Sequence, residues 1–489
     1  MTVIFSGNDF KYEIEGVLKL FIPAQRFDFC YDDRKRVEGD FVFVRIKRTR
    51  SKELLYALCR IDGRCEREAE YTGIKEGQDD ELRLSRLLYK AMSRLTGTAP
   101  MWGVITGIRP VKQVNRLLSK GLSGEEIYSV MEREYLCSRD KISIALSTAS
   151  TQERILAQMP DRSFSLYISI PVCPTRCSYC SFISQTYESA RKLMPEYLEK
   201  LGREIRYTGQ LVKELGLRLD TVYFGGGTPT TLTAGELSGL MKAIEYSFDM
   251  SSVREYTIEA GRPDTITGEK LRAIKENGCT RISINPQTLN ESVLRAIGRE
   301  HTPKMFFDSF ELARRVGFDC INTDIIAGLP TDTEDSFSAT VEKLIELSPE
   351  NYTVHTLSIK RRALLNNGDR SVLDNPADRM VAYATERLSG SGYQPYYLYR
   401  QKNMVGNLEN IGWSKPGQES LYNIYIMEEV QTIIALGAGA STKLLHPETR
   451  ELKRIFNYKY PLEYIKHFDI MIKKKDEIRE FYMGREDHV

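Results

Sequence analysis

The sequence lacks the features that would place this protein in a membrane, outside the cell or on nucleic acid. Its 489 residues contain no apolar run that approaches the ~20 residues of a membrane-spanning helix. The opening segment, residues 1–21, has no basic stretch followed by an apolar one, so we expect no signal peptide. A net charge of +2 gives the whole molecule no electrostatic attraction to nucleic acid or to a membrane surface. We therefore predict neither among its partners.

Cysteine is scarce and mostly scattered, and there is no internal repeat or low-complexity tract. Six of the nine cysteines form no motif with one another: Cys30, Cys59, Cys65, Cys137, Cys279 and Cys320. An odd number of cysteines without a secretion signal is typical of reduced thiols, which predicts a cytoplasmic location. The 41% hydrophobic and 28% charged residues are ordinary for a globular chain, and its length predicts two or three domains.

The remaining three cysteines, Cys173, Cys177 and Cys180, form a C-x3-C-x2-C motif directly after a predicted strand. Three thiolates at this spacing can hold three irons of a [4Fe–4S] cluster and leave the fourth iron open to a small molecule. The alternatives are a zinc site or three unrelated buried cysteines. Zinc usually takes four ligands, and no fourth cysteine or histidine lies near in the sequence. The motif therefore favours a cluster.

This cysteine motif resembles that of the radical S-adenosylmethionine (SAM) enzymes. In those enzymes the amino and carboxylate groups of the methionine moiety occupy the open iron. Electron transfer from the cluster then splits the sulfonium and releases a 5′-deoxyadenosyl radical. The resemblance implies that the three cysteines are both metal ligands and catalytic residues.

From Ser165 onward, short β-rich segments alternate with amphipathic helical stretches. The strand candidates are Leu166–Ile170, Thr221–Phe224, Tyr256–Ala260, Arg281–Asn285, Ile321–Ala327 and Tyr352–Ile359. The helical stretches include Met194–Leu215, Ala234–Phe248, Pro303–Val316 and Glu334–Leu347. Six β/α units in series predict a parallel sheet but are too few for an eight-stranded barrel. A partial (β/α)6 barrel or a doubly wound sheet remains.

Two further regions are predicted on either side of these units. Residues 1–155 mix strand-like alternation with helical periodicity, which predicts an N-terminal α+β domain. Residues 160–388 hold the β/α units. From residue 389 the alternation of strand-like and helical segments ends, and we expect residues 389–489 to form a mostly helical region that covers the substrate.

Each predicted strand is followed by a polar or glycine-rich group. In parallel α/β barrels the reactive groups lie at the carboxyl ends of the strands. Here these groups are the cysteine motif, Gly225-Gly-Gly-Thr-Pro229, Glu259, Gln287, Asp324 and His355. A single glycine-rich turn or strand-end carboxylate is more often structural. Six in register predict a ligand site at one end of the sheet.

The residue types indicate which parts of SAM they suit. A glycine run lets backbone groups approach a ligand closely, and Glu259 suits the methionyl ammonium group. Asp324 and Gln287 can hydrogen-bond ribose hydroxyls. Arg299 can pair with a carboxylate through a bidentate fork, although a surface arginine after a helix is the alternative. Tyr179 is expected to shield the cluster and pack on adenine.

Taken together, the motifs resemble the oxygen-independent coproporphyrinogen III oxidase (dehydrogenase) family. The shared segments lie between Ser165 and Ile359: Y-x-x-I-P-x-C-x3-C-x-Y/F-C, G-G-G-T-P-T, I-E-A/x-x-P, a Q-x-x-x-E turn ending in R-E, and D-x-I-x-G-L-P. A looser match is Leu436-Gly-Ala-Gly-Ala-Ser441. The N-terminal domain and the segments TGIRPVK, VHTLSIKR and YYLYRQK are similar to the HemZ-type branch of this family.

The resemblance implies a fold, a reaction and a set of contacts. The fold is the partial (β/α)6 TIM-like barrel of the radical SAM type, and one or two SAM molecules bind beside the [4Fe–4S] cluster. The implied SAM contacts are Tyr167, Tyr179, Gly226, Gly227, Thr228, Glu259, Gln287, Arg299, Asp324 and Ser358. The reaction is the oxidative decarboxylation of two coproporphyrinogen III propionates to the vinyl groups of protoporphyrinogen IX in haem biosynthesis. A flavodoxin or ferredoxin is the expected electron donor.

Basic side chains are candidates for anchoring the propionates of such a tetrapyrrole. They are His355, Lys360, Arg361, Arg362, Arg400 and Lys402. For each of them taken singly, a solvated surface position is the equal alternative.

Two positions depart from the oxidases and leave other functions open. Phe182 stands where the oxidases have a fourth cysteine, and Ser169 stands where they have histidine. Related haem-trafficking proteins share the phenylalanine but carry H-N-x-x-Y-W, where this chain has Tyr422-Asn-Ile-Tyr-Ile426. A haem-binding trafficking protein without decarboxylase activity is therefore the first alternative. An RNA-modifying radical SAM enzyme is the second, because of the basic run Arg45-Ile-Lys-Arg-Thr-Arg50, which is more often a solvated strand edge. We favour the decarboxylating enzyme.

Overall fold

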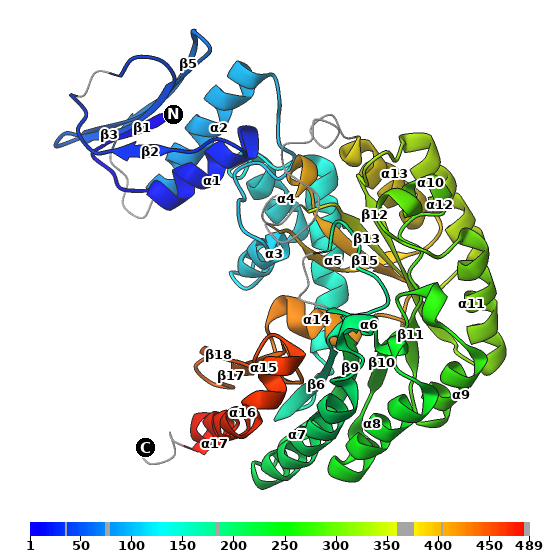
Figure 1. Ribbon diagram of the computed structural model, residues 1–489. Helices are drawn as coiled ribbons and strands as arrows, with labels where there is room; N and C mark the ends of the chain where they lie inside the picture. Colours follow the sequence, from blue (N-terminus) through cyan, green and yellow to red (C-terminus); the bar gives the residue numbers. More distant parts are fainter. Residues whose placement is uncertain (35–36, 74–78, 181–184, 359–375, 402–403, 484–489) are drawn as a thin grey trace. The chain divides into compact units, whose positions relative to one another are not determined.

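A computed structural model gives the fold and describes residues 1–34, 37–73, 79–180, 185–358, 376–401 and 404–483 (Figure 1). The chain forms two compact units. One comprises residues 1–149 with 399–408, and the other comprises residues 150–398 with 409–489. Residues 409–489 thus group with the barrel. The three domains predicted above, 1–155, 160–388 and 389–489, stay a prediction. Within the described ranges, no helix is both long and apolar enough to cross a bilayer.

The first unit is built on a five-stranded sheet in the order β2-β1-β3-β4-β5. The strands are β1 (Thr2–Ser6), β2 (Asp28–Cys30), β3 (Phe41–Arg48), β4 (Lys52–Ile61) and β5 (Arg64–Gly73). Helices α1 (Lys11–Phe21) and α2 (Asp80–Thr96) pack in the same core. The Asp79 carboxylate caps α2 by accepting a hydrogen bond from the Leu82 amide at 3.0 Å. This unit is the α+β region predicted from the sequence.

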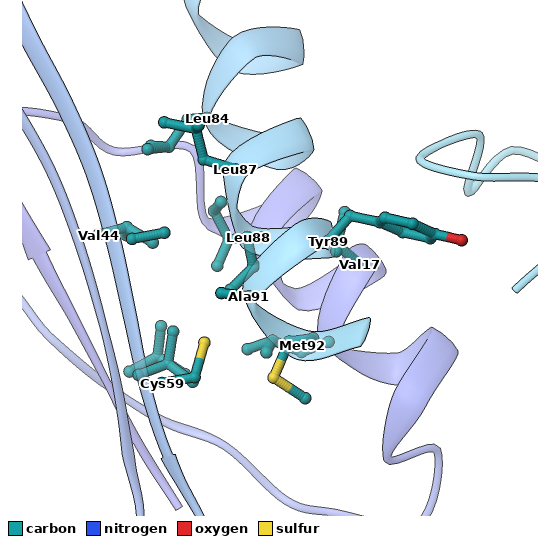
Figure 2. Close-up of a cluster of buried hydrophobic side chains, with 14 of the residues drawn as sticks. Val17, Val44, Cys59, Leu84, Leu87, Leu88, Tyr89, Ala91 and Met92 are labelled. Atoms are coloured by element: carbon teal, nitrogen blue, oxygen red, sulfur yellow. The ribbon is translucent and has the colours of Figure 1, made fainter. Parts of the chain in front are cut away.

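The core of the first unit lies between its sheet and its helices (Figure 2). Burial alternates along β3 and β4, as expected for strands with one face in the core. The buried side chains include Val44 and Cys59 from the strands, Val17 from α1, and Leu84, Leu87, Leu88, Ala91 and Met92 from α2. Apolar side chains that recur every two residues on the strands and about every 3.6 residues on α2 therefore pack together in one apolar layer.

Three more helices and the segment 399–408 complete the first unit. The helices are α3 (Pro110–Leu118), α4 (Gly124–Arg133) and the first part of α5 (Arg139–Leu156). Arg400 ties the segment down, because its backbone amide donates to the Ile108 carbonyl at 2.7 Å and its guanidinium donates to the carbonyls of Ile105 and Asn407. Ile108 of the segment TGIRPVK and Arg400 of the segment YYLYRQK, far apart in sequence, are thus joined within this unit.

The second unit contains the predicted partial barrel. Six parallel strands lie in the order β13-β12-β11-β10-β9-β6. They are β6 (Ser163–Ile170), β9 (Arg218–Gly226), β10 (Glu255–Glu259), β11 (Arg281–Ser283), β12 (Cys320–Ala327) and β13 (Asn351–Thr356). Each of the six predicted strands overlaps one of these. The (β/α)6 expectation is confirmed.

Helices flank the outer face of this curved sheet (Figure 1). They are α7 (Met194–Glu214), α8 (Ala234–Ser247), α9 (Gly268–Glu276), α11 (Pro303–Val316), α12 (Glu334–Leu347) and α13 (Ala377–Gly390). Local signals set several of their starts. Thr233 and Glu236 form a capping box at α8, and the Thr302 hydroxyl accepts from the Met305 amide at α11. Such local capping explains why the predicted helix bounds agree with the structure.

The C-terminal region adds strands to both edges of the barrel sheet. β16 (Thr432–Leu436) pairs in parallel with β6, and β17 (Ser441–Leu445) and β18 (Leu452–Phe456) continue antiparallel. At the other edge, β15 (Asn410–Ser414) pairs antiparallel with β13, and β14 (Gln394–Tyr399) follows it. The expected helices are α14 (Leu421–Glu428), α15 (Pro461–Lys466), α16 (Phe468–Lys474) and α17 (Asp476–Met483). The sequence analysis missed the strands, because each is short and no amphipathic helix marks it as part of a β/α unit.

A buried ion pair fastens the C-terminal helices to the barrel. Glu204 on α7 and Lys475 are both fully buried, with Oε1 and Nζ 3.0 Å apart. Glu204 also accepts hydrogen bonds from the Tyr464 hydroxyl at 2.7 Å, the Gly437 amide at 2.8 Å and the Asn457 amide at 2.9 Å. Removing one member would leave the other charge buried and uncompensated, which makes this network a strong attachment point.

Candidate functional site

The three cysteines lie on the loop that follows β6, at the carboxyl ends of the barrel strands. Cys177 is buried, and Cys173 and Cys180 are half-buried. The loop is held in place by backbone hydrogen bonds, including one from the Ser178 amide to the Ile297 carbonyl at 3.0 Å. A short parallel pairing of β7 (Val172–Cys173) with β8 (Gln185–Thr186) fixes its start. The cysteines are therefore presented by an ordered loop next to the strand ends.

Two side chains donate hydrogen bonds to the cysteine sulfurs. The Thr228 hydroxyl lies 3.5 Å from Cys173 Sγ, and Arg262 Nη1 lies 3.7 Å from Cys177 Sγ. Donors at a sulfur stabilise its thiolate form, which is the form that ligates metal. The residues present therefore fit a thiolate-bound group. Sequence reasoning proposed Thr228 as a SAM contact and missed Arg262 altogether.

The arrangement of the thiols also distinguishes between kinds of metal site. In the described part of the chain, no three His, Cys, Asp or Glu side chains are gathered as a site for a metal ion. A zinc ion requires its ligands at ~2.0–2.3 Å from one point. A [4Fe–4S] cube instead takes each cysteine on a different iron, so its thiolates need not converge on one point. The thiols of the described loop are therefore not placed as a zinc ion requires.

The glycine run after β9 packs directly against the cysteine loop. The Gly227 amide donates to the Ile170 carbonyl at 2.7 Å, and the Thr228 amide donates to the Val172 carbonyl at 2.8 Å. A Cβ on Gly227 would lie 2.4 Å from the Val172 oxygen, and Gly226 has a φ of +106°. Both positions therefore require glycine. The close approach that the sequence suggested for a ligand is made here by the cysteine loop, and ligand binding by Gly226 and Gly227 stays a prediction.

Glu259 lies at the end of β10, and in the part of the chain that the structure describes one side chain donates a hydrogen bond to it. Its Oε1 accepts a hydrogen bond from the Tyr223 hydroxyl at 2.6 Å. Burial and the nearby Asp324 carboxylate raise the pKa of Glu259 to about 7, although the Tyr223 hydroxyl acts in the opposite direction. An ammonium group brought to this carboxylate would restore its charged form.

Asp324, on β12, is by contrast held as a carboxylate. Its oxygens accept hydrogen bonds from the side-chain amides of Asn285 at 2.7 Å and Asn322 at 2.8 Å, and His355 Nε2 lies 3.7 Å away. Burial raises the pKa of Asp324, but hydrogen bonding and charge from His355 together with Asn322 lower it by more, so the net shift is downward. Asp324 is therefore a charged acceptor at neutral pH.

Arg299 is buried, so the alternative of a surface arginine is wrong. Its Nη1 donates to the carbonyls of Gly261 at 3.0 Å and Asn285 at 3.1 Å, and its Nη2 lies 3.4 Å from the Tyr179 hydroxyl. Its Nε is buried and has no hydrogen-bond partner among the described residues. This edge of the guanidinium is a donor that a bound carboxylate can satisfy.

Gln287 reaches the same edge of the sheet through its backbone. It adopts a left-handed conformation with φ +65°, and its amide donates to the Asp324 carbonyl at 3.0 Å. Its side chain is buried. The remaining predicted contact, Ser358, lies two residues beyond β13 and is half-buried.

Three stacked tyrosines line the barrel beside Glu259. The rings of Tyr223 and Tyr422 are 4.3 Å apart with planes 20° from parallel, and Tyr167 stacks 6.1 Å from Tyr223 and 6.2 Å from Tyr422. They come from β9, α14 and β6, respectively. Only Tyr167 was predicted. The sequence offers only a weak signal for Tyr223, which is its position two residues before the glycine run. Tyr422 is the first residue of the segment that this chain has where the haem-trafficking proteins carry H-N-x-x-Y-W.

Other candidates have structural positions or fall outside the description. Ser169 is buried and its hydroxyl donates to the Ala438 carbonyl at 2.8 Å, within the glycine-rich segment after β16. Arg400 was suggested as a propionate anchor, but its guanidinium donates hydrogen bonds to the carbonyls of Ile105 and Asn407. That suggestion is therefore corrected. Phe182, Lys360, Arg361, Arg362 and Lys402 lie outside the described residues.

Comparison with known proteins places these motifs in context. Residues 167–344 match the Radical SAM superfamily. The chain is 41% identical over 387 residues to the Bacillus subtilis oxygen-independent coproporphyrinogen-III oxidase-like protein HemZ, covering 76% of each protein. It is 30% identical over 328 residues to the Lactococcus lactis heme chaperone HemW, covering 65% of this chain and 80% of the relative. It is 33% identical over 199 residues to the Escherichia coli oxygen-independent coproporphyrinogen III oxidase, covering 41% and 43%.

Proposed function

We propose that this protein catalyses the oxygen-independent oxidative decarboxylation of coproporphyrinogen III propionates. The chain belongs to the oxygen-independent coproporphyrinogen-III oxidase-like family of radical SAM proteins. The observation that carries the proposal is the placement of the cysteine loop, Glu259, Asp324 and Arg299, with its unpartnered Nε, at the carboxyl ends of one parallel sheet. The Glu259 carboxylate, with one hydrogen-bond donor among the described residues, suits the ammonium group of an amino acid moiety, and the unpartnered Nε of Arg299 suits its carboxylate.

The residues divide between two cofactors. Cys173, Cys177 and Cys180 would hold the [4Fe–4S] cluster, and Glu259, Asp324, Gln287 and Arg299 would hold one molecule of SAM. When bound, these groups supply the 5′-deoxyadenosyl radical, and the protein supplies orientation and exclusion of water. We extend the proposal to a flavodoxin- or ferredoxin-type electron donor and a cytoplasmic location. The proposal is for one or two molecules of SAM in each chain.

The chain's own residues then have separate tasks. Glu259 pairs with the ammonium group in its deprotonated form, and Asp324 accepts from ribose hydroxyls because Asn285 and Asn322 hold it in place. Arg299 offers its free Nε to the carboxylate. The tyrosine stack fills the adjacent part of the barrel with aromatic surface, which excludes water from the reacting groups.

A haem-binding trafficking function is the second candidate. The observation that favours it is the breadth of the match to the heme chaperone HemW, 80% of that protein against 43% of the Escherichia coli oxidase. The RNA-modifying alternative has weaker support. In the basic run of β3, Arg45 pairs with Asp33 at 3.1 Å, and Arg48 pairs with Glu53 at 3.2 Å and also with Asp80.

One anaerobic experiment separates the first two candidates. The reconstituted full chain is reduced with dithionite and incubated with SAM and coproporphyrinogen III, and products are followed by chromatography and mass spectrometry. We expect 5′-deoxyadenosine, methionine and protoporphyrinogen IX, and none of these from the triple Cys→Ala variant. If 5′-deoxyadenosine forms while the propionates stay intact, and haem binds in a one-to-one complex, the trafficking function replaces the proposed one.

A further inference from the structure

A buried arginine reaches the sulfur of the central cysteine from outside the cysteine motif. Arg262 follows β10 by three residues and its side chain is 3% exposed. Its Nη1 lies 3.7 Å from Cys177 Sγ, and its Nη2 donates to the Thr175 hydroxyl at 3.0 Å. Thr175 in turn donates to the Gly298 carbonyl at 3.2 Å. One edge of this guanidinium therefore faces the cysteine loop.

The other edge is fixed by a carboxylate two residues further along. Arg262 Nε and Nη2 donate to the two oxygens of Asp264, each at 3.0 Å. This bidentate pairing fixes the plane of the guanidinium and so directs Nη1 at the sulfur. Burial raises the pKa of Asp264, but Arg262 lowers it by more, so the carboxyl is charged at neutral pH. The arginine, the carboxylate and the thiol form a rigid line of groups.

We propose that Arg262 is a positioning residue for the cluster: it hydrogen-bonds the Cys177 thiolate, raises the reduction potential of the cluster, and is aimed by Asp264. The inference rests on the proposed function in one respect, that Cys177 is a cluster ligand. The potential of an iron–sulfur cluster depends on hydrogen bonds to its sulfurs and on nearby charge. A guanidinium stays protonated, and a buried cation is poorly screened. It stabilises the reduced cluster, which carries one more electron.

The effect of Asp264 has the opposite sign. Its carboxylate lies on the far side of the guanidinium from the sulfur and offsets part of the positive charge that the cluster experiences. Removing the cation should therefore lower the potential, whereas removing only the anion should raise it. If Arg262 and Asp264 had a purely structural role, the two substitutions would not shift the reduction potential in opposite directions.

A second arginine, at the opposite end of β10, provides a matched control. Arg254, immediately before β10, is also held by a bidentate carboxylate, with Nε 2.6 Å and Nη2 2.8 Å from the oxygens of Asp220. Its other partners among the described residues are the Gln158 carbonyl and the Tyr425 hydroxyl. Arg254 thus matches Arg262 in chemistry but stands at the amino end of the strand.

The experiment is a potentiometric titration of the cluster, followed by electron paramagnetic resonance, on anaerobically reconstituted full-length variants. For Arg262→Gln we expect at least a tenfold lower ratio of reduced to oxidised cluster at the wild-type midpoint, which is about 59 mV for one electron. Arg262→Lys keeps the charge and should shift less. Asp264→Asn should shift the midpoint in the positive direction, and Arg254→Gln should leave it unchanged.

Each outcome decides the inference. An unchanged midpoint in Arg262→Gln with full iron content overturns it, and so does a negative shift in Asp264→Asn. If Arg262→Gln retains no cluster, Arg262→Lys and Asp264→Asn decide, and their failure to shift the midpoint in opposite directions overturns it. A wild-type chain that assembles no cluster overturns the proposed function. A normal cluster with an unresponsive midpoint overturns only the role of Arg262.

Discussion

Two glutamates of one strand show how the two ends of the barrel differ. Glu255 starts β10 and Glu259 ends it. The Glu255 carboxylate accepts from the Leu421 amide at 2.7 Å and the Ser420 hydroxyl at 2.9 Å, and it lies 3.6 Å from Arg281 Nε. Among the described residues, Glu259 accepts one hydrogen bond, from Tyr223 at 2.6 Å. The amino end of the strand has satisfied its carboxylate within the protein, and the carboxyl end has kept capacity for a ligand.

The arginines at these ends do not repeat this contrast. Arg281, at the start of β11, donates to the Asn351 side chain and to the carbonyls of Gln418 and Glu419. Arg299, at the carboxyl end, donates to the carbonyls of Gly261 and Asn285. In both arginines Nε is buried and has no hydrogen-bond partner among the described residues. An unpartnered buried donor therefore does not by itself identify a functional group, and the difference between the two ends rests on their glutamates.

The largest expected effect is the loss of iron when the three cysteines at the carboxyl ends of the barrel strands are replaced. We expect the wild-type chain to hold about four irons after anaerobic reconstitution, as a [4Fe–4S] cluster requires. The Cys173→Ala, Cys177→Ala, Cys180→Ala triple variant should hold almost none. The control is Cys279→Ala with Cys320→Ala, two buried thiols at the amino ends of β11 and β12, which should keep the full iron content. Equal iron in the triple variant and wild type would contradict the cluster assignment.

Exchanging the two glutamates should affect different properties. Glu255→Ala should lower the free energy of unfolding by about 3–5 kcal/mol, because it leaves Arg281 buried beside an empty position. Glu259→Gln should leave the thermal unfolding midpoint at pH 8 unchanged or raise it, since a carboxyl whose pKa is raised destabilises the fold above that pKa.

Circular dichroism melting curves measure both variants. A loss of stability in Glu259→Gln equal to that in Glu255→Ala would remove the distinction between the two ends.

Asp324 should matter for SAM binding more than for folding. Loss of a hydrogen bond to a charged group costs ~1.5–3 kcal/mol, so Asp324→Ala should raise the SAM dissociation constant at least about tenfold. Equilibrium dialysis with the reconstituted chain measures this value. Asp220→Asn is the matched control, because Asp220 is a buried carboxylate at the amino end of β9. An equal loss of affinity in both variants would indicate general disruption of the barrel.

The pKa of Glu259 predicts how SAM binding depends on pH. Since burial holds that pKa near 7, the carboxyl is protonated below neutrality and must lose its proton to pair with an ammonium group. SAM affinity should therefore rise by about tenfold per pH unit below 7 and level off above it. Binding to Glu259→Gln should be weak and nearly independent of pH between 6 and 8. A wild-type affinity without this slope would show that Glu259 does not bind the ammonium group.

The smallest effect is expected in the tyrosine stack. Tyr422→Phe keeps the ring that lies 4.3 Å from Tyr223, and should leave stability and SAM affinity close to wild type. Tyr422→Leu removes the ring and should cost about 0.5–1.5 kcal/mol of stability beyond the lost apolar area. Thermal melting of the two variants side by side measures the difference. Equal melting temperatures would show that the stacking contributes little.

Much of the barrel was predictable because its signals are local. The predicted helix Pro303–Val316 coincides with α11, and Glu334–Leu347 coincides with α12, since each begins after a threonine cap. Strands β14 to β18 were missed because they are short and no amphipathic helix marks them as part of a β/α unit, and two of them, β15 and β16, join the sheet through strands distant in sequence. For example, β16 pairs with β6 across more than 250 residues. Arg262 occupies a variable position of the I-E-A/x-x-P segment, and Tyr422 opens the segment compared with the trafficking motif, so neither residue type stood out in the sequence. Only their contacts with Cys177 and Tyr223 in the structure identify them.

The sequence by itself determined the cysteine spacing, the order of β/α units and the residue type at the end of each strand, because these depend on neighbours within a few positions. Only the tertiary structure decided which charges are satisfied. Glu255 accepts hydrogen bonds from Ser420 and Leu421, over 160 residues away, and lies beside Arg281, whereas among the described residues Glu259 accepts from Tyr223. The difference arises because desolvation and hydrogen bonding act through space, so two glutamates four positions apart on one strand acquire different chemistry.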